Sequence, residues 1–170
     1  LAVGTKGKYQ SFKELQSAKG LKYAVTSPSS TSWVAGKILA KTTGLDITFL
    51  PGYKGSSKIA LSLIRGDTQL SLFADNSYAK YAKGGDVKAV LSLDDTSPFK
   101  GVPSVGDIGH ADLTSLATER MVGGPPGMPK EIVAILEKAI LQAGASKPIQ
   151  DWAKKTNQDI KPLSTKATDE

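Results

Sequence analysis

The chain has 170 residues, enough for one domain with a hydrophobic core, and a formal net charge of +6 at pH 7. Hydrophobic residues make up 39% of it, which argues against intrinsic disorder, and no apolar run approaches the roughly 18 residues that a membrane-spanning helix needs. There is no cysteine, so disulfides, thiolate metal sites and a cysteine nucleophile are excluded.

The positive charge is spread along the chain. Lysines are scattered from Lys6 to Lys154, and no cluster of basic and aromatic residues stands out. We therefore expect solvated faces and no nucleic-acid surface, with a mild attraction for small anions. No signal-peptide pattern opens the chain, which would equally hold for a mature or trimmed secreted protein.

The first predicted elements are a strand and a short helix. Residues 1–4 have the apolar character of the end of a strand. Ser11 and Glu14 stand three positions apart and match a capping box, which predicts a helix that begins after Ser11 and stops near Gly20.

The most informative stretch runs from residue 22 to residue 39. It predicts a buried strand over Lys22–Val25, a hydroxyl-rich turn over residues 26–32, and an amphipathic helix from Trp33 that closes at Gly44. The turn then lies at the amino end of a helix, where unpaired N–H groups and the helix dipole favour an anion. The alternative is that one of its hydroxyl residues is merely the helix N-cap.

Two similar strand–turn–helix units follow. Strands are predicted over residues 46–50, 70–73 and 87–91, and helices end near residues 65 and 82. Three successive units predict an α/β fold with a mostly parallel sheet flanked by helices. The turns at residues 27–32, 53–55 and 75–76 then share one edge, where such sheets bind ligands.

The last part of the chain is predicted to be less regular. Residues 94–116 read as a long loop, and residues 121–122 and 159–163 as short extended segments. Pro129 is expected to open a helix, and a second helix is predicted over residues 148–156 with Trp152 buried.

The sequence offers no convincing catalytic set. His110 is the only histidine and is expected in a surface loop, so neither a metal site nor a histidine-based triad is predicted. Ser77 and Lys80 fit the S-x-x-K pattern of serine acyl enzymes, but the other motifs of those enzymes do not follow. Asp94 and Asp95 are adjacent in a predicted loop, which does not suit acid–base work.

Several segments match the motifs of one family in that family's order. Ala35-Gly36-Lys37 stands for "AGE" in the helix after the hydroxyl-rich turn. Five further segments match family motifs. Residues 51–55 match "PYKG", 65–76 match "GG-VDL-F-DN", 83–91 match "KAGK-RALAV", 103–105 match "PSV" and 124–133 match "APAGTPKEIV". Over nearly its whole length the chain thus resembles the substrate-binding proteins of tripartite tricarboxylate transporters, the Bug family.

The resemblance implies a type II periplasmic-binding-protein-like lobe of a two-lobed, non-enzymatic, periplasmic protein. Such a protein closes on a small carboxylate and delivers it to membrane permease subunits, without cofactor or metal. Residues 1–117 would form the second lobe and residues 118–170 the return segment and C-terminal helices, with the opening third of the protein missing. Carried over by position, the ligand site comprises Ser27, Ser29, Ser30, Thr31, Ser32, Tyr53, Lys54, Asp75 and Asn76.

Three departures from the family pattern concern the site. Pro28-Ser29 replaces Asn-Gly, which changes the turn and removes one N–H donor. Gly52 is inserted in the "PYKG" turn, and Trp33 stands where the family often has histidine. These differences bear on the ligand and on the detail of the pocket more than on the fold.

Two other functions remain open at this stage. One is a ligand-sensing effector domain of a transcription regulator, which would be cytoplasmic and fused to a helix-turn-helix. The other is a serine hydrolase that uses Ser77 and Lys80. For a lobe without its companion we also expect weak ligand binding or self-association, because part of the pocket wall and some apolar surface would be left open to solvent.

Overall fold

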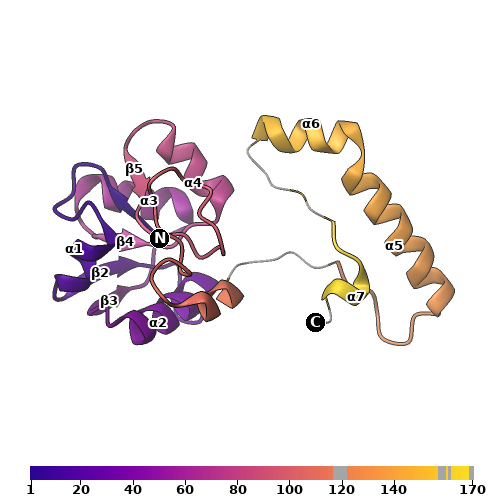
Figure 1. The fold of residues 1–170 in the computed structure, drawn as a ribbon, viewed down its shortest axis with the longest axis horizontal. Coiled ribbons are helices and arrows are strands. Elements are labelled where there is room, and N and C mark those ends of the chain that lie inside the picture. Colours follow the sequence, from indigo (N-terminus) through magenta and orange to yellow (C-terminus); the bar gives the residue numbers. More distant parts are fainter. Residues whose placement is uncertain (117–121, 157–159, 161, 169–170) are drawn as a thin grey trace. The chain divides into compact units, whose positions relative to one another are not determined.

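The computed structural model describes residues 1–116, 122–156, 160 and 162–168, without the side chains of residues 75, 76, 167 and 168. The chain divides into two compact units, Leu1–Thr118 and Glu119–Glu170. Both are drawn in Figure 1. Each unit is described by itself.

The first unit is built on a five-stranded sheet with the strand order β3-β2-β4-β1-β5 (Figure 1). The strands are β1 (Ala2–Gly4), β2 (Leu21–Ala24), β3 (Ile47–Leu50), β4 (Leu70–Ser71) and β5 (Val87–Ala89). β2 pairs in parallel with β3 and β4, whereas β1 pairs antiparallel with β4 and β5. Four strands therefore point the same way and β1 alone runs against them.

The predicted mostly parallel sheet is thus confirmed, and the carboxyl ends of β2, β3 and β4 meet at one edge. The place of β1, between β4 and β5, was not predicted. Hydrogen bonds extend this pairing at both ends: the Val90 N–H donates to the Leu1 carbonyl at 2.9 Å, and the Thr5 N–H to the Asp86 carbonyl at 3.0 Å. The partners lie far apart in the chain, so no local pattern predicts the pairing.

Four α-helices and one 3-10 helix complete the unit. They are α1 (Phe12–Ser17), α2 (Thr31–Thr43), α3 (Ser56–Arg65), α4 (Asp75–Ala82) and η1 (Ala111–Leu116). The predicted cap of α1 is confirmed, since the Ser11 hydroxyl accepts the Glu14 N–H at 3.3 Å. Gly44 closes α2 in the left-handed conformation, with φ 76°, that glycine adopts at little cost.

Apolar side chains pack on both faces of this sheet. The larger cluster holds Val3, Leu15 and Leu39, and so joins β1, α1 and α2. The smaller cluster holds Ala2 and Leu63, from β1 and α3. Because Ala2 and Val3 are consecutive in a strand, their side chains point to opposite faces, so α1 and α2 cover one face and α3 the other.

Gly36 lets α2 approach the sheet closely. A Cβ atom at this position would lie 2.9 Å from Tyr23 Cζ and 3.0 Å from Phe49 Cε1, both closer than packed carbon atoms allow. The two rings are themselves in contact, with centroids 5.0 Å apart. The missing side chain therefore sets the distance between the helix and strands β2 and β3.

The second unit consists of helices α5 (Lys130–Ala145), α6 (Lys147–Thr156) and α7 (Thr165–Thr168). Both longer helices were predicted, and α5 begins directly after Pro129. Gln150 joins parts of the unit, because its amide nitrogen donates to the Gly144 carbonyl at 2.7 Å and to the Ile160 carbonyl at 3.0 Å.

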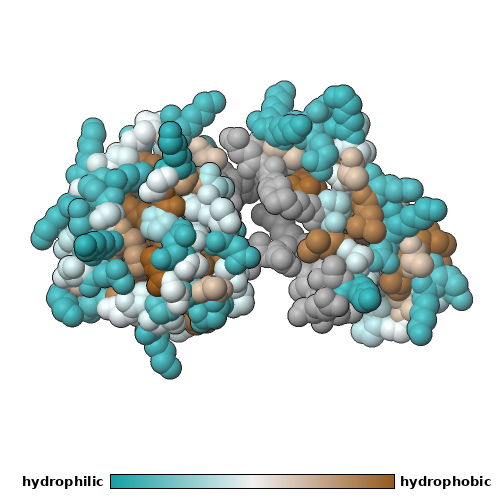
Figure 2. All heavy atoms as spheres, viewed as in Figure 1, coloured by the Kyte–Doolittle hydropathy of each residue, from teal (hydrophilic) through white to brown (hydrophobic). Residues whose placement is uncertain are grey.

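Most large apolar side chains of α5 and α6 are exposed. Figure 2 shows hydrophobic residues along α5. Trp152 is 52% exposed, so the prediction that it is buried is wrong. The physical reason is that the described part of this unit has no sheet and no further layer of helices over that face. The exposed set is Ile132, Val133, Ile135, Leu136, Ile140, Ile149 and Trp152.

The remaining predictions concern loops. Residues 94–110 form the expected long loop, which ends in η1. The predicted extended segments at 121–122 and 159–163 fall partly outside the described residues, since 121, 159 and 161 are not described. Over the part of the chain that is described, no helix is long and apolar enough to span a bilayer.

Candidate functional site

The first two predicted turns lie side by side at the carboxyl edge of the sheet. β2 leads into the turn over residues 26–32, and β3 into the turn over residues 51–55. The Gly52 N–H donates to the Thr26 carbonyl at 3.1 Å, and the Tyr53 N–H to the Val25 carbonyl at 3.3 Å. These two bonds continue the parallel pairing of β2 and β3 and hold the turns together.

Tyr23 connects the first turn to the chain that follows β4. Its side chain is fully buried, and its hydroxyl donates to the Ser32 carbonyl at 2.9 Å and accepts the Leu72 N–H at 3.1 Å. Burial raises the pKa of Tyr23 well above its usual range, although the Leu72 N–H acts in the opposite direction, so the phenol keeps its proton. A neutral hydroxyl can both donate and accept, as this position requires.

A second bond supports the same junction. The buried Ser71 hydroxyl donates to the Ala24 carbonyl at 2.9 Å, which ties the end of β4 to the end of β2. The first two predicted turns and the chain that leaves β4 therefore share one edge of the sheet. Sequence reasoning missed Tyr23 and Ser71, although a tyrosine in a buried strand always needs a partner for its hydroxyl.

Ser30 is the N-cap of α2. Its hydroxyl accepts the Trp33 N–H at 3.3 Å and donates to the Ser27 carbonyl at 2.8 Å. Ser29, just before it, adopts a left-handed conformation with φ 70°, uncommon for a residue with a side chain. The Ser30 hydroxyl thus holds the turn in shape, as the capping alternative proposed.

The first two helical residues offer unused donors. The N–H groups of Thr31 and Ser32 precede the first intrahelical bonds, and neither has an acceptor among the described residues. Thr31 is exposed and Ser32 half-buried. The helix that they open has 13 residues, so its dipole places partial positive charge at these two amides.

The turn at residues 51–55 brings a tyrosine and a cation to the same edge. Tyr53 is half-buried and Lys54 is exposed. Gly52 and Gly55 flank them with φ 102° and 81°, and Gly55 is the N-cap of α3. Two left-handed positions within four residues require glycine, which accounts for the Gly52 that departs from the family pattern.

Asp75 and Asn76 do not form the predicted turn. They are the first two residues of α4, because the N–H groups of Ser77 and Tyr78 both donate to the Ala74 carbonyl, at 3.0 and 2.9 Å. The chain leaves β4 through residues 72–74 instead. The side chains of Asp75 and Asn76 lie outside the described part of the structure.

Two other candidate residues make contacts of their own. The Lys80 ammonium lies over the Tyr81 ring, 5.8 Å from its centroid. The backbone of His110 belongs to the long loop, where its N–H donates to the Val105 carbonyl at 2.9 Å. Among the described residues, no three histidine or acidic side chains gather as metal ligands would.

No family model matches the chain. Protein BugT of Bordetella pertussis (strain Tohama I) is 23% identical over 129 residues, which cover 75% of this chain and 39% of BugT.

Solved structures match over almost the whole chain. A TctC solute binding protein from Polaromonas superimposes with a TM-score of 0.72 at 20% identity, covering 98% of this chain and 59% of that one. Rpa4515 of R. palustris with adipate gives a TM-score of 0.73 at 22% identity, covering 99% and 58%. This chain has the fold of the Bug and TctC solute-binding proteins.

A third structure of the Bug and TctC fold carries a different ligand. MatC from Rhodopseudomonas palustris with bound malate matches with a TM-score of 0.65 at 19% identity, covering 91% of this chain and 54% of MatC. The present chain spans about two fifths of BugT and between 54% and 59% of these three structures. The predicted resemblance is thus confirmed for the fold.

Proposed function

We propose that this chain belongs to a periplasmic solute-binding protein that captures a small carboxylate for a membrane permease of the tripartite tricarboxylate type. In this proposal residues 1–117 are its second lobe, and residues 118–170 are the return segment and C-terminal helices. The protein has no catalytic role, needs no cofactor and does not bind nucleic acid.

The unused amides of Thr31 and Ser32 are the observation that carries this proposal. A carboxylate placed before α2 accepts both N–H groups and meets the positive end of the helix dipole. Hydrogen bonds to a charged acceptor are roughly twice as strong as neutral ones. Two proteins of the same fold were solved with dicarboxylates, adipate and malate.

The surrounding residues then take distinct roles. The hydroxyls of Ser27, Thr31 and Ser32 add donors. The Ser29 hydroxyl donates to the Pro28 carbonyl within the turn, and Ser30 maintains the shape of the turn. Tyr53 and Lys54 come from the neighbouring turn, which is hydrogen-bonded to the first. Lys54 supplies a positive charge for a second carboxylate, and Asp75 and Asn76 contribute from the start of α4. Closure of the companion lobe completes the site.

A proline at position 31 tests this role of the backbone. Ser30 has φ −63° and ψ 153°, which suits a residue before proline, and proline is favoured at the first helical position. Thr31→Pro therefore removes one N–H with little cost to the helix. Thr31→Ser keeps both the N–H and a hydroxyl and is the matched control.

The measurement is thermal unfolding with increasing adipate, malate or citrate. A ligand that binds the folded state raises the melting temperature in proportion to ln(1 + [L]/Kd). Loss of one hydrogen bond to a charged group corresponds to about 1.5–3 kcal/mol, or roughly 10- to 100-fold in affinity. We expect Thr31→Pro to lose most of the shift and Thr31→Ser to keep it. Equal shifts in the two variants would overturn the proposed role of this amide.

A further inference from the structure

We propose that the first unit carries a second anion site, in a hollow beside the edge strand β5, which takes a small polyanion with an apolar body. The hollow shares no residue with the carboxylate site proposed at the start of α2. The inference stands apart from the proposed transport function, because it rests on other residues and other contacts.

The hollow has the size of a small-molecule site. Its volume is about 700 Å³, within the roughly 300–1,000 Å³ usual for ligand pockets. One wall is α1 with the residues just before it, and another is the loop over residues 99–103. Residues 88–90 and Tyr78 of α4 complete it.

Hydrogen bonds and ring contacts hold the walls in place. The Phe99 ring meets Tyr78 edge-on, with centroids 4.8 Å apart, and the Tyr78 hydroxyl accepts the Ala89 N–H at 2.8 Å. In the loop, the Val102 N–H donates to the Phe99 carbonyl at 3.1 Å, and the Pro103 carbonyl accepts the Ser92 N–H at 2.9 Å. The shape is therefore largely formed before any ligand arrives.

Three lysines line the hollow, and none of its described lining residues is acidic. Lys13, Lys88 and Lys100 come from α1, β5 and the loop, and none of them has an ion-pair partner among the described residues. Two acidic side chains close in sequence have other partners. Glu14 accepts the N–H of residue 10, and Asp107 accepts the N–H and hydroxyl of residue 104.

Like charges around one hollow repel each other, and a bound polyanion relieves that repulsion. Apolar and aromatic residues supply the remaining lining, so the body of the ligand should be a ring or short hydrocarbon. The chemical class is thus an organic di- or tricarboxylate with an apolar frame. These lining residues are Phe12, Tyr78, Val90, Phe99, Val102 and Ile108.

The test uses benzene-1,3,5-tricarboxylate as probe and calorimetric titration of the full chain. We expect saturable binding that weakens as salt is raised. The variant Lys13→Gln/Lys88→Gln/Lys100→Gln should bind at least tenfold more weakly. Phe99→Ala should lower the affinity for the probe several-fold. It should leave the affinity for citrate, which lacks a ring, nearly unchanged.

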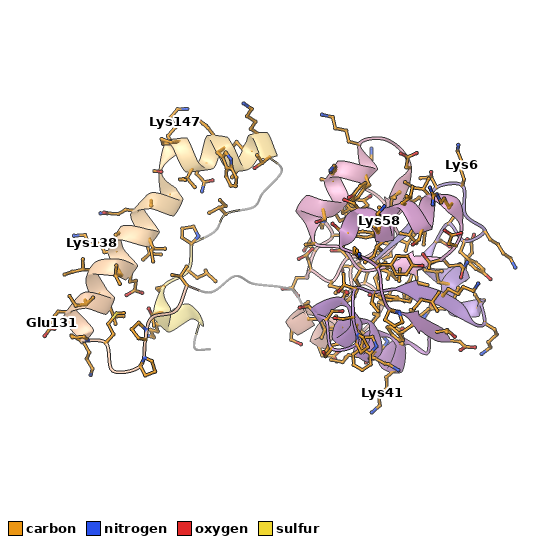
Figure 3. The ribbon with its side chains drawn as sticks, turned by 180° about the vertical axis from the view of Figure 1, so that it is seen from behind. Lys6, Lys41, Lys58, Glu131, Lys138 and Lys147 are labelled. Carbon is orange, nitrogen blue, oxygen red and sulfur yellow. The ribbon has the colours of Figure 1, made fainter. Side chains whose placement is uncertain are left out.

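A matched control removes the same charge elsewhere on this unit. Lys6→Gln/Lys41→Gln/Lys83→Gln changes exposed lysines that do not line the hollow, two of which are labelled in Figure 3. This control variant should bind the probe with an affinity within twofold of the wild-type value. An equal loss in both triple variants would show that net charge alone attracts the probe, and would overturn the site.

Amide shifts separate the two sites. Bound probe should shift the amide signals of residues 88–90 and 99–102, and Thr31→Pro should leave that binding unchanged. Shifts confined to residues 27–32, or loss of probe binding in Thr31→Pro, would assign the probe to the carboxylate turn and contradict a second site. Melting temperatures of all variants show whether each is folded.

Discussion

At the scale of single residues, Tyr23 determines how the proposed site is assembled. It is the one residue whose side chain bonds both the first turn of α2, at Ser32, and the chain after β4, at Leu72, among the described contacts. Gly36 leaves room for its ring, since a Cβ there would lie 3.0 Å from the Tyr23 hydroxyl. Because its buried hydroxyl both donates and accepts a hydrogen bond, Tyr23 holds two loops together at one point.

Tyr23→Phe keeps the ring and removes the hydroxyl, which leaves the Leu72 N–H and the Ser32 carbonyl without this partner. We expect the free energy of unfolding to fall by about 1–3 kcal/mol, the cost of an unsatisfied buried polar group. Chemical denaturation measures this. Tyr9→Phe is the control, because the structure shows no hydrogen bond from the Tyr9 hydroxyl to any described residue. This control should change the free energy of unfolding little.

The same variant has a predictable pH dependence. Because the pKa of Tyr23 is raised in the folded state, ionisation favours the unfolded chain once the pH exceeds about 10, the ordinary value for tyrosine. Stability from this group is complete below that pH and declines above it. Tyr23→Phe should therefore lose less stability than the wild type between pH 9 and pH 11. Identical pH profiles would contradict the assignment.

At the scale of elements, the sequence predicted the strands and helices well where local signals are strong. Ser11 and Gly44 occupy the helix caps that were predicted for them, and α3 ends at Arg65, where its end was expected. Three successive units also implied a common edge, and the turns at residues 27–32 and 51–55 lie there. The exception is Asp75, which begins a helix because the Ala74 carbonyl accepts the first helical bonds.

What could not be predicted depends on long-range contacts. β1 enters the sheet beside strands formed by residues 70–71 and 87–89, and nothing within residues 1–4 specifies that position. The Tyr23 hydroxyl can bond both Ser32 and Leu72 only because β4 lies beside β2 in the sheet. Trp152 shows the opposite error: it was predicted to be buried, but in α6 only its neighbour Ala153 is buried, and the described part of the unit leaves Trp152 52% exposed.

At the scale of the whole molecule, the exposed apolar face of α5 and α6 should act between copies. Ile135 is 63% exposed and Trp152 52%, and large exposed apolar patches mark contact surfaces. We predict that the sedimentation coefficient rises with protein concentration. Ile135→Lys/Trp152→Lys should remain monomeric, while Val34→Lys/Ile38→Lys, which adds the same charge in the first unit, should not. A wild-type monomer at all concentrations would contradict this.

Amide NMR can show whether a carboxylate binds the N–H groups of Thr31 and Ser32, as the proposed function requires. The ¹⁵N-labelled chain would be titrated with adipate or malate while backbone N–H signals are followed. We expect the amide-proton signals of Thr31 and Ser32 to move downfield together and to saturate, as hydrogen bonds to a carboxylate require. Saturable shifts elsewhere, with these two amides unchanged, would show that the ligand binds at another place and that the proposed site is wrong.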